Sequence, residues 1–108
     1  MTLQSHVDSI AATMESGFEG YGTEDEYGET QDAFCYLDDI LDINWILNSD
    51  KTYKSARILV AFGGPNIWID TGKKKVEGYW WGKYAEAEYC DSEFSQELDA
   101  ALESLFEC

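Results

Sequence analysis

The sequence predicts a small α+β domain in which two N-terminal helices precede an antiparallel meander of four to five strands and a C-terminal helix. Hydrophobic residues recur at helical spacing near both ends of the chain, and they alternate or run continuously through its centre. Turn-forming residues separate the central segments. The 108 residues fit one domain and carry no internal repeat or linker, so we expect residues 1–108 to form one unit with the helices on one side of the sheet.

The first helix is predicted over residues 3–18. Thr2 or Ser5 can cap its start, and the glycines from position 17 onward can end it. Its buried stripe is expected to consist of Leu3, Val7, Ile10, Ala11, Met14 and Phe18. Residues 19–29 are rich in glycine and carboxylates and predict a loop.

A second helix is predicted over residues 30–41, with Thr30 as its cap. Its buried stripe is expected to consist of Ala33, Phe34, Leu37, Ile40 and Leu41. Asp32, Asp38 and Asp39 are expected on its polar side.

The predicted strands are residues 42–48, 56–62, 66–70, 75–81 and 83–89. Residues 42–48 alternate between apolar and polar side chains, whereas residues 56–62 are almost uniformly apolar and predict a central strand covered on both faces. Residues 49–52 and 71–74 are typical of hairpin turns, and Gly82 separates the last two strands.

The last helix is predicted to start at Asp91 or Ser92, either of which can act as its cap. Its inward face is expected to consist of Phe94, Leu98, Ala101, Leu102 and Leu105. Its outward face carries Glu93, Glu97, Asp99, Glu103 and Glu107.

The net charge of −15, from 22 acidic and 7 basic residues, exceeds the magnitude of about 2 to 8 that keeps a small domain soluble. The charge is also divided along the chain. Residues 1–50 hold twelve carboxylates and residues 84–108 hold eight, with no Lys or Arg in either segment, whereas residues 51–83 contain all seven basic residues. A halophilic protein is expected to spread its carboxylates more evenly. The division favours binding to a basic partner, because like charge repels nucleic acid and anionic membranes.

Catalytic motifs are missing from the sequence. His6 is the only histidine, and no nucleophile or nucleotide-binding motif occurs, so we expect a protein that is not an enzyme and needs no cofactor. Three cysteines without CxxC spacing predict neither a disulfide framework nor a zinc site. The carboxylates of residues 24–29 lack the order of a calcium-binding loop, so no metal site is predicted.

The N-terminal residues have neither a basic leader nor an apolar run of signal-peptide length, and no stretch has the roughly 20 apolar residues that cross a bilayer. We therefore expect a cytoplasmic protein with reduced thiols.

Rows of carboxylates are the predicted partner-binding surface. Residues three and four apart on a helix lie roughly 5 to 6 Å apart, comparable to phosphates along a DNA strand, which rise about 3.4 Å per charge. The expected contact residues are Glu24, Asp25, Glu26, Asp32, Asp38, Asp39, Asp42, Glu86, Glu88, Glu93, Glu97 and Glu103. The alternative is that these carboxylates form only a solvated surface.

Aromatic residues form a second candidate surface. If residues 75–81 are a strand, Trp80 faces the core, and Trp68, Tyr79 and Trp81 cover the other face of the sheet. These three side chains either belong to the packed sheet or anchor a partner.

The segments ILVAFGGPNIWIDT (residues 58–71) and GYWWG (residues 78–82) resemble a pattern found in small acidic proteins of phages and mobile elements. In size and charge the chain also resembles anti-CRISPR and antirestriction inhibitors. This resemblance implies a DNA mimic in a bacterial host cell that blocks the DNA-binding groove of a CRISPR effector or restriction enzyme. The alternative is an adaptor or regulator that binds a protein through its aromatic surface, with the acids giving solubility and steering.

Overall fold

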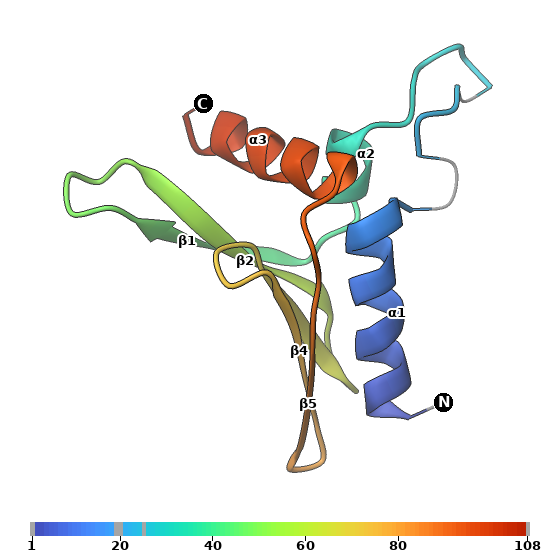
Figure 1. Ribbon diagram of the computed structural model, residues 1–108, viewed down its shortest axis with the longest axis vertical. Coiled ribbons are helices and arrows are strands. Elements are labelled where there is room, and N and C mark those ends of the chain that lie inside the picture. The colour runs from blue at the N-terminus through green and yellow to red at the C-terminus, as the bar shows by residue number, and fades with distance from the viewer. Residues whose placement is uncertain (1, 19–20, 25, 108) are drawn as a thin grey trace.

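The computed structural model of the chain describes residues 2–18, 21–24 and 26–107. It has the predicted α+β architecture, in which two helices are followed by a five-stranded antiparallel sheet and a third helix (Figure 1). The strands follow the order β1-β2-β3-β4-β5, so each pairs with its neighbour in the sequence. The elements are α1 (Leu3–Ser16), α2 (Ala33–Leu37), β1 (Asp42–Leu47), β2 (Tyr53–Ala61), β3 (Asn66–Asp70), β4 (Lys75–Trp80), β5 (Lys83–Glu88) and α3 (Glu93–Glu107).

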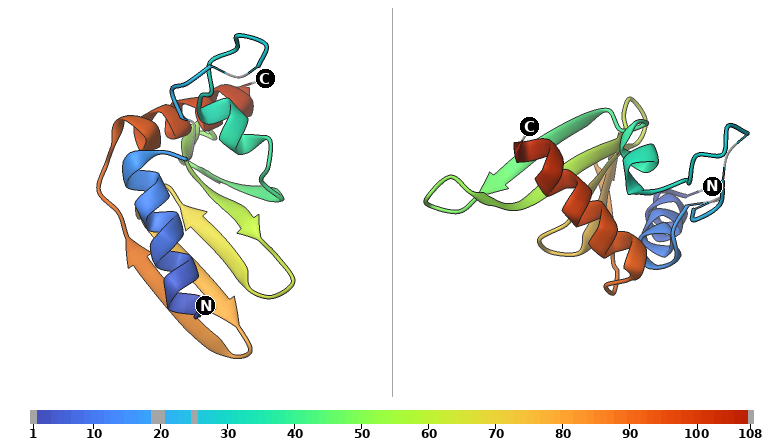
Figure 2. Two further views of the ribbon diagram at one scale, coloured as in Figure 1. Left: turned by 90° about the vertical axis from the view of Figure 1, so that its right-hand side faces the viewer. Right: turned by 90° about the horizontal axis from the view of Figure 1, so that it is seen from above.

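The helices cover one face of the sheet (Figure 2). Helix α1 packs on β4 and β5, and α3 packs on β2, α1 and α2. Helix α1 lies close to β4 at Gly78. A Cβ atom at this position would lie 2.7 Å from Val7 and 2.9 Å from Leu3, so only glycine fits without a shift of these side chains. The central core consists of Ile58, Ile69 and Val76, which pair across three strands and are fully buried.

Both long helices begin with the same reciprocal pair of hydroxyl side chains. The backbone N–H of Ser5 donates to Thr2 Oγ1 at 3.1 Å, and the N–H of Thr2 donates to Ser5 Oγ at 3.0 Å. At α3, the N–H of Ser95 donates to Ser92 Oγ and the N–H of Ser92 donates to Ser95 Oγ. The caps fix the first turns because they satisfy N–H groups without a partner inside the helix.

Helix α2 is shorter than predicted and begins later. Asp32, instead of Thr30, is its cap, and the Asp32 side chain accepts from the Cys35 N–H at 3.3 Å. The helix ends early because the chain must enter the sheet: the Leu41 N–H donates to the Leu59 carbonyl at 2.8 Å. Leu41 lies beyond the helix and is exposed, and Phe34 is exposed within it, so the predicted place of both residues in the buried stripe is wrong.

Three other expectations about side chains are corrected. Phe62 and Trp81 lie outside the strands, because β2 ends at Ala61 and β4 ends at Trp80. Leu105 is 39% exposed, and it is Phe106 that packs on Trp45, with ring centroids 5.5 Å apart. The predicted burial of residues 56–62 on both faces holds in part, because the neighbours Ile58 and Leu59, which point to opposite faces, are both buried, whereas Phe62 is 73% exposed.

Candidate acidic interface

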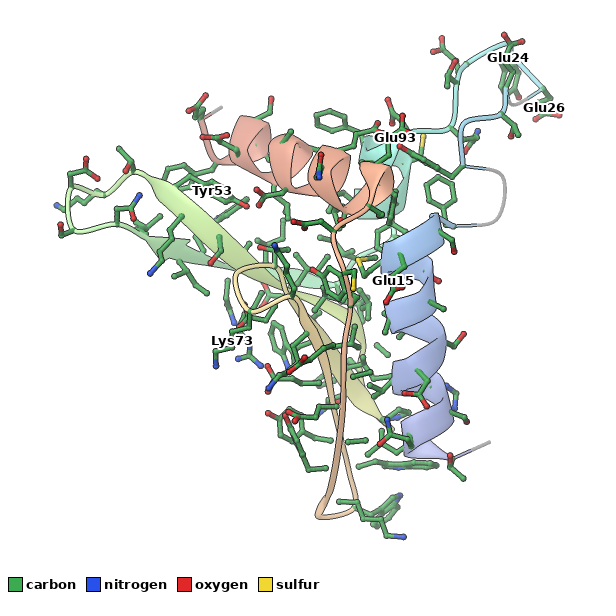
Figure 3. All side chains as sticks on the ribbon, in the orientation of Figure 1. Glu15, Glu24, Glu26, Tyr53, Lys73 and Glu93 are labelled. Atoms are coloured by element: carbon green, nitrogen blue, oxygen red, sulfur yellow. The ribbon has the colours of Figure 1, made fainter. Side chains whose placement is uncertain are left out.

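Some of the carboxylates lie away from the basic side chains (Figure 3). Glu24, Glu26 and Glu93 lie on the side formed by α2, α3 and the loop before α2, whereas Lys73 lies in the β3–β4 turn. The four ion pairs between described residues all involve Arg57, Lys74 or Lys75. Within the described part of the chain, Asp38, Asp39 and the carboxylates of α3 therefore have no Lys or Arg partner, and neither do Glu24 and Glu26 in the loop before α2.

On α3, the predicted row of carboxylates divides into exposed and internal members. Glu93 and Glu103 are exposed, as is Glu107. Glu97 is half-buried and holds three segments together: it accepts a hydrogen bond from the Ala33 N–H at 3.2 Å and another from the Tyr21 hydroxyl. Glu97 thus joins α3 to α2 and to the loop before it.

Tyrosine hydroxyls bind several of the carboxylates in place of basic side chains. Tyr21 donates to Glu97, and Tyr53 donates to Asp99. The bond to Glu97, together with burial and the charges of the surrounding carboxylates, raises the pKa of Tyr21 to about 12. Because a neutral hydroxyl orders a carboxylate without cancelling its charge, this side of the molecule stays anionic.

This role of the tyrosines was not predicted from the sequence. Tyr21 lies within residues 19–29, for which the sequence predicts only a loop. The carboxylate-rich segments contain tyrosines but no Lys or Arg, and this composition could have indicated that tyrosine hydroxyls are the donors to the carboxylates.

The predicted contact residues of α2 and its surroundings have different roles. Asp32 is the helix cap and is half-buried. Asp38 and Asp39, which follow the helix, are exposed, as is Asp42 at the start of β1. In the loop, Glu24 and Glu26 are exposed, and Asp25 lies outside the described residues. We define the acidic surface as Glu24, Glu26, Asp38, Asp39, Asp42, Glu93, Glu103 and Glu107.

Glu86 and Glu88 lie on β5, away from the acidic surface. Glu86 belongs to the face of the sheet opposite the helices, where it accepts from the Tyr84 hydroxyl at 2.6 Å and pairs with Lys75 at 3.1 Å. The Tyr84 hydrogen bond and the Lys75 ammonium lower the pKa of the Glu86 carboxyl. This carboxylate is thus part of a compensated network.

The same open face contains Trp68 and Tyr79. The Arg57 guanidinium lies 5.0 Å from the centre of the Trp68 ring and 3.8 Å from Glu77, whose carboxylate also accepts from Tyr79. Trp81 is not on this face, since it occupies the β4–β5 turn and is 86% exposed. The three aromatic residues grouped by the sequence analysis therefore do not form one surface.

Comparison of the chain with known protein families, with curated proteins and with solved structures found no match. Within the described residues, no group of three or more His, Cys, Asp or Glu side chains is arranged to hold a metal ion. No helix of the described part has the length and apolar character needed to cross a membrane.

We expect Glu97→Ala to lower the free energy of unfolding by about 1–3 kcal/mol, because it leaves the Ala33 N–H and the Tyr21 hydroxyl without their acceptor. Glu93→Ala, on the same helix, removes an exposed carboxylate and should change the free energy of unfolding by no more than about 0.5 kcal/mol. Urea denaturation of both variants measures the difference. Equal effects would contradict the structural role of Glu97, and Glu97→Gln should restore part of the loss.

Stability is expected to fall at alkaline pH. Burial raises the pKa of Tyr36 to about 12, as the Glu97 bond does for Tyr21. Tyrosines of the unfolded chain lose their protons near pH 10. Between pH 10 and 12 the folded state therefore binds more protons than the unfolded state, and the free energy of unfolding declines as pH rises.

Denaturation at successive pH values measures this decline in the free energy of unfolding, and absorbance at 295 nm reports the ionisation of the tyrosines. Tyr21→Phe should make the decline shallower, and an unchanged slope would show that Tyr21 ionises normally.

Proposed function

We propose that the protein is a DNA-mimicking inhibitor that binds the basic DNA-binding groove of a nucleic-acid-binding protein through the acidic surface. The observation that carries the proposal is the uncompensated charge of that surface. Its carboxylates have no ion-pair partner among the described residues, and the neighbouring Glu97 and Asp99 are held by tyrosine hydroxyls. A surface of uncompensated carboxylates attracts a basic groove and speeds association with it.

The positions of two carboxylates on α3 support the proposal. Glu103 and Glu107 lie in the last turns of the helix, where the chain has no basic residue. Negative charge near a helix C-terminus opposes the helix dipole and costs about 0.3–1 kcal/mol for each residue. Local stability therefore does not account for these carboxylates, whereas binding to a cationic partner does.

The length of α3 also suits a DNA-binding groove. Its 15 residues extend for roughly 22 Å at 1.5 Å per residue. Glu93 and Glu107 lie at its two ends, with Glu103 between them. Helix α2 packs beside α3, and Asp38 and Asp39 follow it. The carboxylates are therefore distributed over a distance comparable to several phosphates of a DNA strand.

The size and charge of the chain favour a CRISPR effector or a restriction enzyme in a bacterial host cell as the partner. Such a partner contains a groove built to bind phosphates, and the protein competes with DNA for that groove. The second candidate function is an adaptor that binds a protein through aromatic side chains. It is favoured by one observation, the 86% exposure of the Trp81 side chain.

The test is competition for DNA. The purified protein is added to CRISPR effectors and restriction enzymes bound to labelled duplex DNA, and release of the DNA is followed by fluorescence anisotropy. We expect displacement of DNA from at least one of them, with an affinity that falls steeply between 50 and 200 mM salt. The protein alone should not bind the duplex.

Two results contradict the mimic. A shift of duplex DNA by the purified protein at low salt would show that its own surface attracts phosphates. Binding to one of these enzymes with little dependence on salt would favour the aromatic adaptor, because apolar contacts are not screened by ions.

A further inference from the structure

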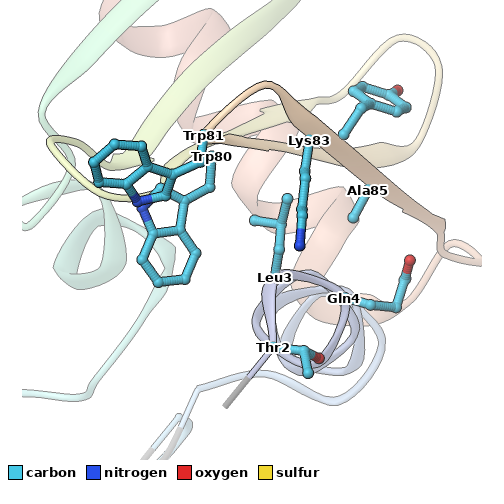
Figure 4. Close-up of a pocket in the computed structure, with 8 residues that line it drawn as sticks. Thr2, Leu3, Gln4, Trp80, Trp81, Lys83 and Ala85 are labelled. Atoms are coloured by element: carbon cyan, nitrogen blue, oxygen red, sulfur yellow. The ribbon is translucent and has the colours of Figure 1, made fainter.

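A cavity lies at the end of the molecule opposite α3, between the first turn of α1 and the β4–β5 hairpin (Figure 4). Its volume is about 610 Å³, within the range of about 300–1,000 Å³ typical of small-molecule sites. The residues that line it are Thr2, Leu3, Gln4, Trp80, Trp81, Lys83, Tyr84 and Ala85.

The lining of the cavity differs in charge from the rest of the protein. It contains no carboxylate, although 22 of the 108 residues are acidic, and it contains one basic residue, Lys83. The Lys83 side chain extends toward Leu3 and Gln4 at the start of α1 (Figure 4). No carboxylate of the described residues forms an ion pair with Lys83. The cavity is therefore suited to an anionic group, for which Lys83 supplies the counter-charge.

Two neighbouring indoles form the apolar wall of the cavity (Figure 4). Trp80 is half-buried and packs against the core, so its ring is held in place. Trp81 and Gly82 form the turn between β4 and β5, with φ angles of 53° and 74°. Asparagine or glycine is the usual first residue of such a turn, because a left-handed backbone disfavours bulky side chains. Neither the turn geometry nor burial accounts for a tryptophan at this position.

We propose that this cavity binds a small organic anion with a planar, apolar body. The anionic group lies at the Lys83 ammonium, and the planar body packs on Trp80 and Trp81. Thr2 and Gln4 supply polar side chains at the rim. This site is distinct from the acidic surface, and the inference does not depend on the proposed function.

The probe for the test is 2-naphthoate, with its neutral analogue 2-naphthamide as the comparison. Binding is followed by NMR through the indole N–H signals of the ¹⁵N-labelled protein, in which Trp45 and Trp68 are internal controls distant from the cavity. We expect 2-naphthoate to shift the signals of Trp80 and Trp81 with saturation, and to leave those of Trp45 and Trp68 unchanged.

Two variants separate the charge from the aromatic wall. Lys83→Gln should weaken 2-naphthoate binding about threefold or more and leave 2-naphthamide binding unchanged. Lys51→Gln, which removes a lysine from the distant β1–β2 turn, should have no effect. Trp81→Asn should weaken both probes about tenfold. It places Asn-Gly in the turn, so the folded structure should be retained or stabilised.

The proposal is overturned if neither probe gives saturable shifts at Trp80 and Trp81, or if the shifts extend equally to Trp45 and Trp68. It is also overturned if Lys51→Gln weakens 2-naphthoate as much as Lys83→Gln does, because the anion would then respond only to total charge. Unchanged affinity in folded Trp81→Asn would exclude the indole wall.

Discussion

Leu98→Ala is expected to lower the free energy of unfolding by about 3–5 kcal/mol. Leu98 is 1% exposed on the buried face of α3 and lies in the core formed by the helices and the sheet. Removing its side chain loses the transfer free energy of the apolar atoms and leaves a cavity that the surrounding residues fill only in part. For a domain whose total stability is about 5–15 kcal/mol, this is a large fraction.

Leu105→Ala is the matched control, because it makes the same substitution on the same helix at a side chain that is 39% exposed. It should cost no more than about 1 kcal/mol. Helix propensity cancels between the two variants, so their difference in urea denaturation reports burial alone. Similar losses at both positions would show that α3 does not face the sheet as described.

Reversing three charges of the acidic surface should weaken partner binding about 100-fold. The variant Glu93→Lys, Glu103→Lys and Glu107→Lys replaces attraction to a basic groove with repulsion along the whole of α3. A 100-fold loss of affinity corresponds to roughly 3 kcal/mol of binding free energy. Its net charge is −9, because each reversal adds two units. Glu97 is kept, since its carboxylate binds Ala33 and Tyr21.

The fold of this variant should be retained. Lys at position 93 is unfavourable at the start of α3, whereas Lys at positions 103 and 107 favours the end of the helix, so the dipole effects partly cancel. The control is the variant Asp8→Lys, Glu15→Lys and Glu88→Lys, which has the same net charge but alters exposed positions on α1 and β5. Circular dichroism checks the fold, and displacement of DNA from the partner measures binding. Equal inhibition by the two variants would show that total charge, and not the acidic surface, governs binding.

Much of the fold could be predicted because local patterns and tertiary structure agree. The helical spacing of Leu3, Val7 and Met14 predicted α1, and the Thr2 cap predicted its start. Residues 66–70 were predicted as a strand with the boundaries observed for β3. In these segments the burial pattern required by the core is the one that the sequence itself repeats.

The candidate site could be predicted only in part. The sequence showed which segments carry carboxylates, but not which of these carboxylates are free to meet a partner. Glu93 and Glu97 are one helical turn apart and look alike in sequence, yet only Glu93 is exposed. The difference arises because α2 and the loop before it pack against α3 at Glu97, a contact between residues more than 60 positions apart.

The sequence by itself determined the α+β class, the order of the elements and the division of charge along the chain, because composition and hydrophobic periodicity are local properties. Tertiary structure alone decided that α2 ends at Leu37, that Trp81 leaves the sheet, and that Glu97 and Glu86 are bound within the molecule. The end of α2 and the role of Glu97 depend on contacts between distant segments, because Leu41 must reach Leu59 and Glu97 binds donors more than 60 positions away. Trp81 leaves the sheet because Trp80 pairs with Lys83 across the turn, and Glu86 is bound by Tyr84 and Lys75 once β4 and β5 pair. Local sequence shows neither which residues pair nor which donors a carboxylate meets.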